Sequence, residues 1–216
     1  MEVEIEKNLL AQNDRLAQEN KQILEQAGVF AFDIVGSPGS GKTALLEHLL
    51  DRLGREINLA VIEGDLYTRK DAERLEGYDS EVIQINTQGA CHLEALSIQQ
   101  ALRKLDLEEL DGLIIENVGN LVCPASFALG TAVTITVLSV PEGNDKPLKY
   151  PALFEQSRAV VINKIDLVAE TNFSLTEAET DLEALNPKLE LFPLSCSSGR
   201  GLKEFCTYLK ELMQDE

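Results

Sequence analysis

Gly36-Ser37-Pro38-Gly39-Ser40-Gly41-Lys42-Thr43 is the stretch of sequence that decides the fold of this chain. It follows the apolar run 29–35, which predicts a buried strand, and it precedes a leucine-rich run that predicts a helix. The order of strand, G-x-x-x-x-G-K-[ST] and helix is typical of a phosphate-binding loop, because its glycines let successive backbone N–H groups turn toward a phosphate. We expect Lys42 to reach the outer phosphates and the Thr43 hydroxyl to coordinate Mg²⁺. The chain is therefore predicted to bind a nucleoside triphosphate.

The composition argues against several classes of protein. The chain has 216 residues, enough for one large domain with a sizeable core, and a net charge of -18. Such a charge argues against nucleic acid as a partner, because binding to a phosphate backbone needs clustered Lys and Arg. No apolar run is long enough for a membrane span, and the acidic, polar start is unlike a signal peptide. The four cysteines form no dense framework, so we expect a cytoplasmic protein in a reducing compartment.

From residue 28 onward, apolar runs alternate with helical patterns. This alternation predicts an α/β fold of three layers, with a mostly parallel central sheet and helices on both faces. Ligands are then expected at the carboxyl ends of the strands. The expected strands are 29–35, 58–63, 81–85, 112–116, 131–140, 159–162 and 189–193, and the expected helices are 42–54, 91–105, 175–185 and 202–213.

The first 27 residues differ from the rest of the chain. Residues 4–26 contain neither Gly nor Pro, and Ile5, Leu9, Leu16 and Ile23 fall on one helical stripe. We predict an amphipathic helix over 1–27 that is ended by a glycine and packs on the domain or on a second copy of the chain. A nucleotide-binding domain is then expected over 28–216.

The sequence Asn163-Lys164-Ile165-Asp166 follows a predicted strand and indicates which base is bound. The Asp166 carboxylate can accept hydrogen bonds from N1–H and the exocyclic amine of guanine, whereas adenine offers neither donor there. The stem of Lys164 can lie along the base, Asn163 can tie loops together, and the loop around Ser197 can offer backbone N–H groups to guanine O6. The alternative is that this N-K-x-D match is only structural. We predict a guanine nucleotide, GTP or GDP.

Two acidic strand ends are candidates for sensing the γ-phosphate. Asp65 is our first choice as a Mg²⁺ ligand, direct or through water, and Thr68 and Asp71 follow it on a loop able to respond to nucleotide. Glu116 and Gly119 form an acidic-x-x-G pattern, in which the carboxylate can bind a Mg²⁺-bound water and the glycine N–H can meet the γ-phosphate. Both carboxylates, with the lysine and threonine of the phosphate loop, form the predicted catalytic set. Either carboxylate could instead cap a helix or lie in solvent.

A third group of residues suggests a second metal. Cys91 and His92 are adjacent at the expected start of helix 91–105, and Cys123 lies on the segment that leaves the acidic-x-x-G pattern. Two thiolates and an imidazole suit Ni²⁺ or Zn²⁺ rather than Mg²⁺ or Ca²⁺. Three ligands per chain leave a fourth position open for release of the ion or for sharing across a dimer. On spacing alone, the cysteines could equally be buried core residues.

Taken together, these motifs resemble those of the HypB family, the GTPases of [NiFe]-hydrogenase maturation, which belong to the SIMIBI class and are related to the urease accessory GTPase UreG. The resemblance covers the chain from about residue 28 and includes Gly36–Thr43, Glu63-Gly64-Asp65, Cys91-His92-Leu93, residues 116–124 and Asn163–Asp166. Many relatives carry an N-terminal Cys-x-x-Cys-Gly-Cys motif or a histidine-rich tract. Residues 1–28 contain no Cys or His, so we expect no nickel storage there.

The resemblance implies an enzyme that hydrolyses GTP to GDP and phosphate and assists nickel insertion into [NiFe]-hydrogenase. It also implies a GTP-dependent homodimer with Ni²⁺ or Zn²⁺ at or near its interface, a HypA-type nickel metallochaperone as partner, and the hydrogenase large-subunit precursor as target. Because Cys123 shares a segment with Glu116 and Gly119, we expect nucleotide and metal to affect each other's binding. Three alternatives remain. They are a related GTPase serving urease or a cobalamin enzyme, a small-molecule kinase, against which the N-K-x-D motif argues, and a metal-binding protein with vestigial nucleotide binding.

Overall fold

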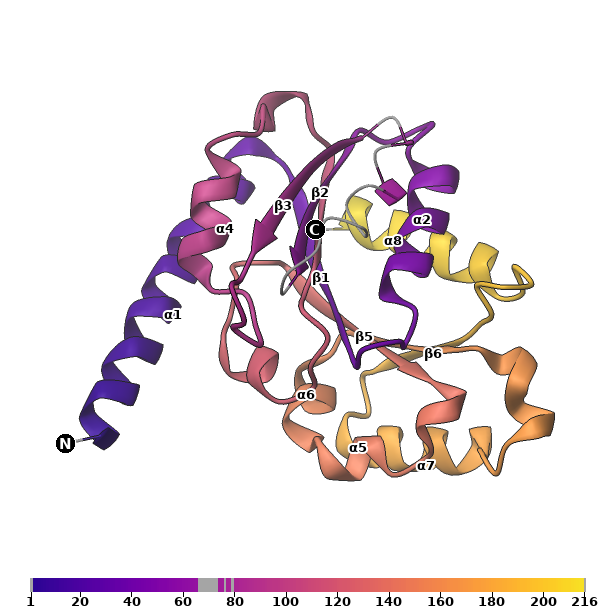
Figure 1. Ribbon diagram of the computed structural model, residues 1–216. Helices are drawn as coiled ribbons and strands as arrows, with labels where there is room; N and C mark the ends of the chain where they lie inside the picture. Colours follow the sequence, from indigo (N-terminus) through magenta and orange to yellow (C-terminus); the bar gives the residue numbers. More distant parts are fainter. Residues whose placement is uncertain (1, 66–73, 76, 79, 216) are drawn as a thin grey trace.

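A computed structural model describes residues 2–65, 74, 75, 77, 78 and 80–215, so Thr68 and Asp71 lie outside the described residues (Figure 1). At its centre is a seven-stranded sheet of order β3-β2-β4-β1-β5-β6-β7, in which all neighbouring strands are parallel. The strands are β1 (Phe30–Gly36), β2 (Leu59–Asp65), β3 (Glu81–Asn86), β4 (Gly112–Glu116), β5 (Val133–Ser139), β6 (Ala159–Asn163) and β7 (Glu190–Pro193). The predicted parallel sheet is confirmed.

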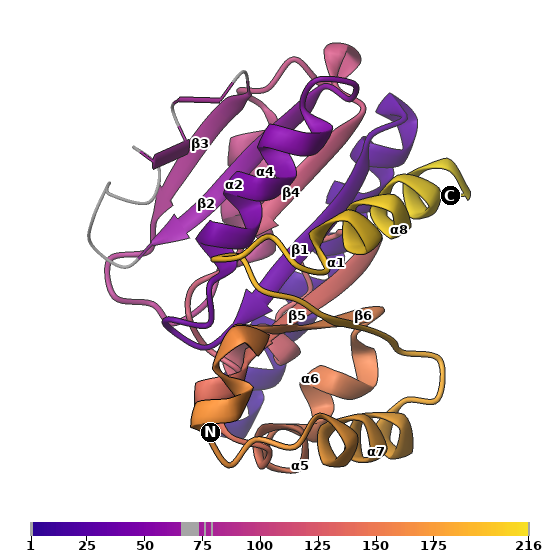
Figure 2. The ribbon, with the colours of Figure 1, turned by 90° about the vertical axis from the view of Figure 1, so that its right-hand side faces the viewer.

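Helices cover both faces of the sheet, which confirms the three-layer architecture (Figures 1 and 2). The helices are α1 (Glu2–Ala27), α2 (Lys42–Leu53), α4 (Ala95–Leu102), α5 (Lys146–Lys149), α6 (Pro151–Gln156), α7 (Leu175–Leu185) and α8 (Leu202–Asp215). Alternate side chains of a strand point to opposite faces. In β6, Val161 packs in the core under α2 and α8, whereas Val160 and Ile162 pack against α6 and α7. The buried apolar side chains of α1 and α4 pack on the same face of the sheet as those of α6 and α7.

The helix expected over 91–105 is wrong at its start, because α4 begins at Ala95. Glu94 is the N-cap and forms a capping box with Ser97, which fixes the first turn of the helix. Cys91 and His92 therefore lie in the loop that follows β3, not at a helix N-terminus. The sequence analysis also missed α5 and α6, which are only four and six residues long and begin at or beside a proline. Elements this short are not visible as a periodic pattern.

α1 confirms the predicted N-terminal helix, and it ends as expected before Gly28, which has φ 72°. The expected apolar stripe, however, is not the face that packs on the domain, and its packing on a second copy of the chain stays a prediction. Leu9 and Ile23 of the expected stripe are 57% and 36% exposed. The buried face instead carries two asparagines, an alanine and a leucine, namely Asn13, Ala17, Asn20 and Leu24.

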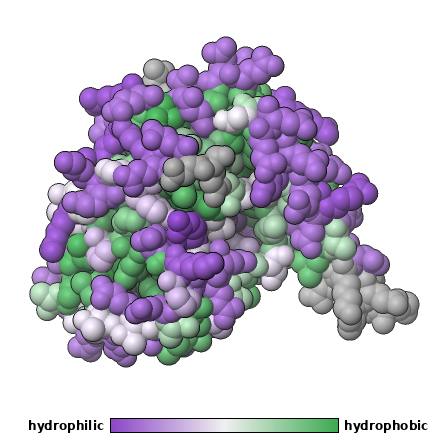
Figure 3. Space-filling view, turned by 180° about the vertical axis from the view of Figure 1, so that it is seen from behind, coloured by the Kyte–Doolittle hydropathy of each residue, from purple (hydrophilic) through white to green (hydrophobic). Residues whose placement is uncertain are grey.

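The face of the molecule shown in Figure 3 carries many hydrophilic side chains, and hydrophobic side chains gather over its lower left part. Even the 26-residue α1 carries acidic, basic and amide side chains along its length. Among the residues that the structure describes, no helix combines the length and apolar character needed to cross a membrane.

Candidate functional site

The predicted phosphate loop joins the carboxyl end of β1 to the start of α2. Gly41 has φ 99°, and a Cβ there would collide with the Asn163 side chain, so this position requires glycine. The Lys42 Nζ donates to the carbonyls of Gly36 and Ser37 at 3.1 and 3.2 Å. The lysine side chain therefore lies across the loop, at the place where phosphate oxygens can compete for its ammonium group.

A cleft of about 430 Å³ opens beside this loop. It is lined by residues of the loop, of the strand ends and of the guanine motif, including Pro38, Gly39, Gly41, Lys42, Thr43, Glu63, Asp65, Arg74, Glu116, Gly119 and Lys164. Most of the residues predicted to contact phosphate or Mg²⁺ thus line one cavity. Gly36, Ser37, Ser40, Asn163, Asp166 and Ser197 do not line it.

Three acidic side chains reach the cleft from adjacent strands. The Thr43 hydroxyl donates to Glu116 Oε1 at 2.7 Å, which joins the start of α2 to the end of β4. Glu63 lies opposite Glu116 in the parallel register of β2 and β4. Both are buried, whereas Asp65, at the end of β2, is half-buried. Such oxygen ligands suit Mg²⁺. Glu63 was missed as a site residue, and the signal that could have found it is a charge within an apolar strand.

The guanine motif is tied to the phosphate loop by direct hydrogen bonds. The Asn163 amide donates to the Ser40 carbonyl at 3.0 Å, and its oxygen accepts from the N–H groups of Lys164 and Cys196. Lys164 has φ 62°, and its Nζ donates to the Gly39 carbonyl at 2.6 Å. Asn163 thus links the loops as the sequence predicted, from a buried position behind the cleft.

Asp166 lies exposed beside the loop 194–199. A hydrogen bond from the Ser195 side chain holds the pKa of the Asp166 carboxyl below its ordinary value, with smaller help from Ser197 and Lys164. The carboxylate is therefore ionised and able to accept donors from a base. Within this loop the hydroxyls of Ser195 and Ser197 lie 2.9 Å apart.

One contact to the same loop was not predicted. His48, on the second turn of α2, places Nε2 at 2.8 Å from the Cys196 carbonyl. The Cys196 peptide is therefore held at its N–H by Asn163 and at its carbonyl by His48. The loop 194–199 is in this way fixed to the helix that follows the phosphate loop.

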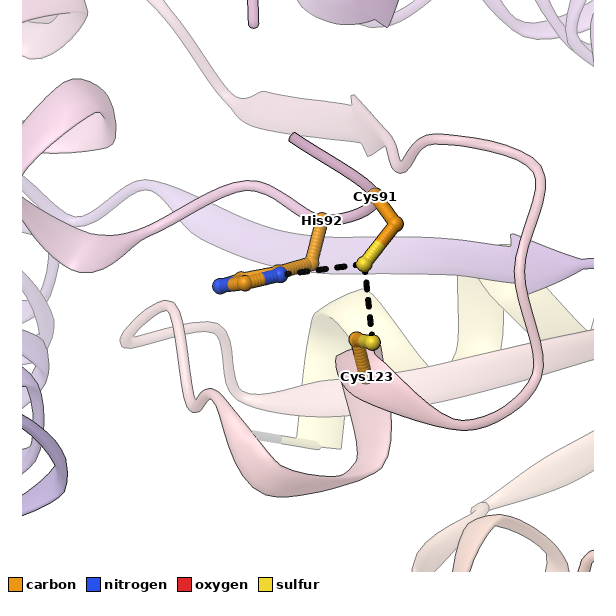
Figure 4. Close-up of side chains that lie close together, drawn as sticks. All are labelled: Cys91, His92 and Cys123. Atoms are coloured by element: carbon orange, nitrogen blue, oxygen red, sulfur yellow. Dashed lines mark hydrogen bonds between the residues drawn. The ribbon is translucent and has the colours of Figure 1, made fainter. Parts of the chain in front are cut away.

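Cys123, which is 32 residues from Cys91 in the sequence, meets the adjacent Cys91 and His92 at one point (Figure 4). The Sγ atoms of Cys91 and Cys123 are 2.9 Å apart, and Cys91 Sγ is 3.7 Å from His92 Nδ1. One ligand atom from each of the three residues lies within 4.8 Å of the others. Cys91 is exposed and Cys123 is half-buried, so they are not core cysteines. Two sulfurs and an imidazole are a suitable set for Ni²⁺ or Zn²⁺.

The surroundings of His92 favour the metal-binding form of its ring. Burial lowers the pKa of His92, although Glu94 opposes the effect. The neutral imidazole, which binds metals, therefore dominates at neutral pH. The ring stacks on Phe127, with centroids 3.8 Å apart and an interplanar angle of 30°. Phe127 was missed, because only the fold brings it next to the histidine.

The metal-ligand loops are connected to the nucleotide loops through Asn120. Its amide donates to the Cys91 carbonyl at 3.1 Å, and its backbone bridges to Gly36 at the start of the phosphate loop. Hydrogen bonding with the Cys91 thiol, then burial, raises the pKa of Cys123, while a hydrogen bond with Asn120 acts in the opposite direction. A change at the phosphate loop can therefore reach both cysteines through one side chain.

Comparison with known proteins shows the family to which the chain belongs. Residues 30–193 match the family described as CobW/HypB/UreG, nucleotide-binding domain. The hydrogenase/urease maturation factor HypB of Helicobacter pylori is 43% identical over 97% of this chain and 88% of its own length. The probable hydrogenase maturation factor HypB of Methanocaldococcus jannaschii is 40% identical over 99% and 96%.

Two solved structures have the same fold. The crystal structure of HypB from Helicobacter pylori in complex with nickel has a TM-score of 0.90 at 43% identity and covers 94% of this chain and 96% of its own. The hydrogenase maturation factor HypB from Archaeoglobus fulgidus has a TM-score of 0.88 at 34% identity, covering 94% and 99%. The chain belongs to the CobW/HypB/UreG family and, within it, to the HypB hydrogenase maturation factors.

Proposed function

We propose that the protein is a GTPase that holds nickel for insertion into [NiFe]-hydrogenase and releases it according to its nucleotide state. The observation that carries this proposal is the 2.9 Å approach of the Cys91 and Cys123 sulfurs beside His92, on loops hydrogen-bonded to the phosphate loop segment. A site of sulfur and imidazole ligands so close to a nucleotide cleft is suited to a carrier whose affinity for nickel has to change with the bound nucleotide. The free thiols it needs persist in a reducing cytoplasm.

In the proposed hydrolysis, water attacks the γ-phosphate of GTP, and GDP and phosphate leave. Lys42 and the loop N–H groups bind the phosphate oxygens, and Asp166 selects guanine. Thr43 and Asp65 would hold Mg²⁺, which neutralises the charge on the phosphates when it is bound. Glu116 would accept a hydrogen bond from a water on the Mg²⁺, and the Gly119 N–H would bind the γ-phosphate. The support for this set is that Lys42, Thr43, Asp65, Glu116 and Gly119 line one cleft. Asp166 lies outside that cleft, in the motif whose Asn163 and Lys164 hydrogen-bond to the phosphate loop.

Nickel is the cargo in this proposal, and Zn²⁺ is a competitor for the same ligands. Among the described residues, three Cys and His ligands converge, so a four-coordinate ion would have one position left for a partner. We propose that this partner is a second copy of the chain, brought together by GTP, and that a HypA-type metallochaperone and the hydrogenase large-subunit precursor bind in turn. The Helicobacter pylori relative is named as a hydrogenase/urease maturation factor, so urease is the second candidate target.

A cysteine substitution tests the proposal. Cys123→Ala should lose Ni²⁺ binding at this site and keep GTP binding and phosphate release, because no nucleotide group depends on that sulfur. Cys206→Ala is the matched control, since it removes a buried thiol from the core under α8. Bound nickel, measured by elemental analysis after gel filtration, and GTP-dependent phosphate release are the two readouts. Retention of nickel by Cys123→Ala, or absence of phosphate release from the parent protein, would overturn the assignment.

A further inference from the structure

The buried face of α1 is unusual because its centre is polar. Asn20 is 0% exposed and Asn13 is 6% exposed, whereas the apolar Leu9 and Ile23 remain at the surface. Burying a side-chain amide is unfavourable unless its donors and acceptors find partners. The contacts of these two asparagines therefore determine where and how α1 docks.

Both amides bind backbone groups of two separate segments. Asn20 Nδ2 donates to the carbonyls of Ala95 and Leu129 at 2.8 and 3.0 Å. Asn13 Nδ2 donates to the Ala128 carbonyl at 2.8 Å, and its Oδ1 accepts from the Ala95 N–H at 2.9 Å. Ala95 is thus held at both its N–H and its carbonyl by the same helix.

These two segments are the ones that carry the candidate metal ligands. Ala95 is the first residue of α4 and follows His92 by three positions, while Ala128 and Leu129 continue the segment that begins with Cys123. The ring of Phe127, one residue before Ala128, stacks on His92. The asparagines of α1 therefore connect, from behind, the loop of Cys91 and His92 with the segment of Cys123.

A glycine at position 130 allows the backbone to come close to α1. Gly130 has φ 95°, and a Cβ there would meet the Ala17 carbonyl and the Asn20 side chain. Glycine thus lets the segment approach the helix closely enough for the asparagine amides to reach it. Figure 1 shows α1 lying along α4 on this side of the molecule.

We propose that Asn13 and Asn20 are positioning residues for the metal site, so that α1 holds the two ligand-bearing segments in register before the ion arrives. This inference rests on the proposed Ni²⁺ site. Removing a group that hydrogen-bonds directly to a metal ligand commonly lowers metal affinity by about 10–100-fold. Asn13 and Asn20 bind the segments next to the ligands, so we expect an effect near the lower end of this range. α1 then has a function in metal binding although it contributes no ligand to the described cluster.

The test compares Asn20→Leu with Asn186→Leu in the full chain. Asn186 is a matched control, because its amide also donates to two carbonyls, those of Glu155 and Ser157, at 3.1 and 2.9 Å. We expect Asn20→Leu to weaken Ni²⁺ binding about 10-fold or more with unchanged GDP affinity, and Asn186→Leu to lower Tm without changing Ni²⁺ affinity. Parent-like Ni²⁺ affinity of Asn20→Leu, or an equal loss in the control, would overturn the inference.

A metal-free measurement separates this inference from the proposed function. Dibromobimane becomes fluorescent when it bridges two neighbouring thiols, and Cys91→Ser gives the background. The bridging rate should be high in the parent and lower in Asn20→Leu, whatever metal the site binds. Should Asn20→Leu fail to fold, Asn13→Leu replaces it, since one of the two hydrogen bonds of Asn13 is only partly buried, whereas both of those of Asn20 are buried. Parent-like bridging in the variant refutes the positioning role, whereas a parent that binds no nickel through its cysteines refutes only the proposed function.

Discussion

The carboxyl group of Asp33 makes the stability of the protein depend on pH in a calculable way. Asp33 lies inside the central strand β1 and is 6% exposed, and its Oδ1 accepts hydrogen bonds from Thr131 and Thr134 at 3.0 and 2.8 Å. Burial raises the pKa of Asp33 from 3.8 to about 6, against the effect of these hydrogen bonds. The folded state therefore favours the protonated acid, and this contribution to stability is lost as the pH rises through the folded pKa.

A pKa rise of this size stabilises the folded protein by about 3 kcal/mol at a pH below both pKa values, relative to a pH above both. About 1.4 kcal/mol of this stabilisation is lost between about pH 5 and pH 8. Asn has no proton to lose, and its oxygen can still accept from both threonines. The free energy of unfolding of Asp33→Asn, relative to the parent, should therefore increase by about 1.4 kcal/mol over this interval.

Urea denaturation at several pH values measures this difference directly. Glu183→Gln is the control, because it removes one negative charge from an exposed position on α7. The free energy of unfolding of the control should differ from that of the parent by a nearly constant amount over the same pH interval. Parallel stability curves for Asp33→Asn and the parent would refute the argument, since they would mean that the pKa of Asp33 in the folded state is not raised into this pH interval.

Two further substitutions test the guanine site. Asp166→Asn should weaken GDP binding by about 100-fold and improve binding of xanthosine diphosphate, because an amide suits the xanthine edge; fluorescent-nucleotide competition measures both, and unchanged GDP affinity would count against the assignment. His48→Leu should weaken GDP binding about five-fold by freeing the Cys196 carbonyl, whereas His48→Gln, which keeps a donor, should bind GDP like the parent. Equal affinities for the Leu and Gln variants would show that the hydrogen bond does not position the loop.

Much of the fold was predictable because its signals are contiguous in the sequence. The strands of a parallel sheet are buried on both faces, so β4 and β6 appear as uninterrupted apolar runs. The phosphate loop and the N-K-x-D motif each carry their chemistry within a few residues. The start of α4 was misplaced because apolar residues continue on both sides of Glu94, and only the capping box with Ser97 marks the boundary.

The errors and omissions of the sequence predictions arise from contacts between residues that are far apart in the sequence. The expected packing face of α1 consisted of its apolar residues. α1 instead contacts the domain through buried amides such as Asn20, which donates to carbonyls 75 and 109 residues away in the sequence. Glu63 joins the cleft because the register of β2 and β4 sets it opposite Glu116. Asn120 and Phe127 became visible only when the two cysteine loops were brought together. The roles assigned to the site residues remain predictions.

We propose that nucleotide and nickel bind to coupled sites, joined through the segment that carries Asn120. Titrating Ni²⁺ into the parent protein, loaded either with GDP or with a non-hydrolysable GTP analogue and Mg²⁺, measures this coupling most directly. We predict that the analogue tightens Ni²⁺ binding by about ten-fold, within the usual range of coupling free energies, and that Asn120→Ala abolishes most of the difference. The same affinity and stoichiometry with both nucleotides would contradict the account.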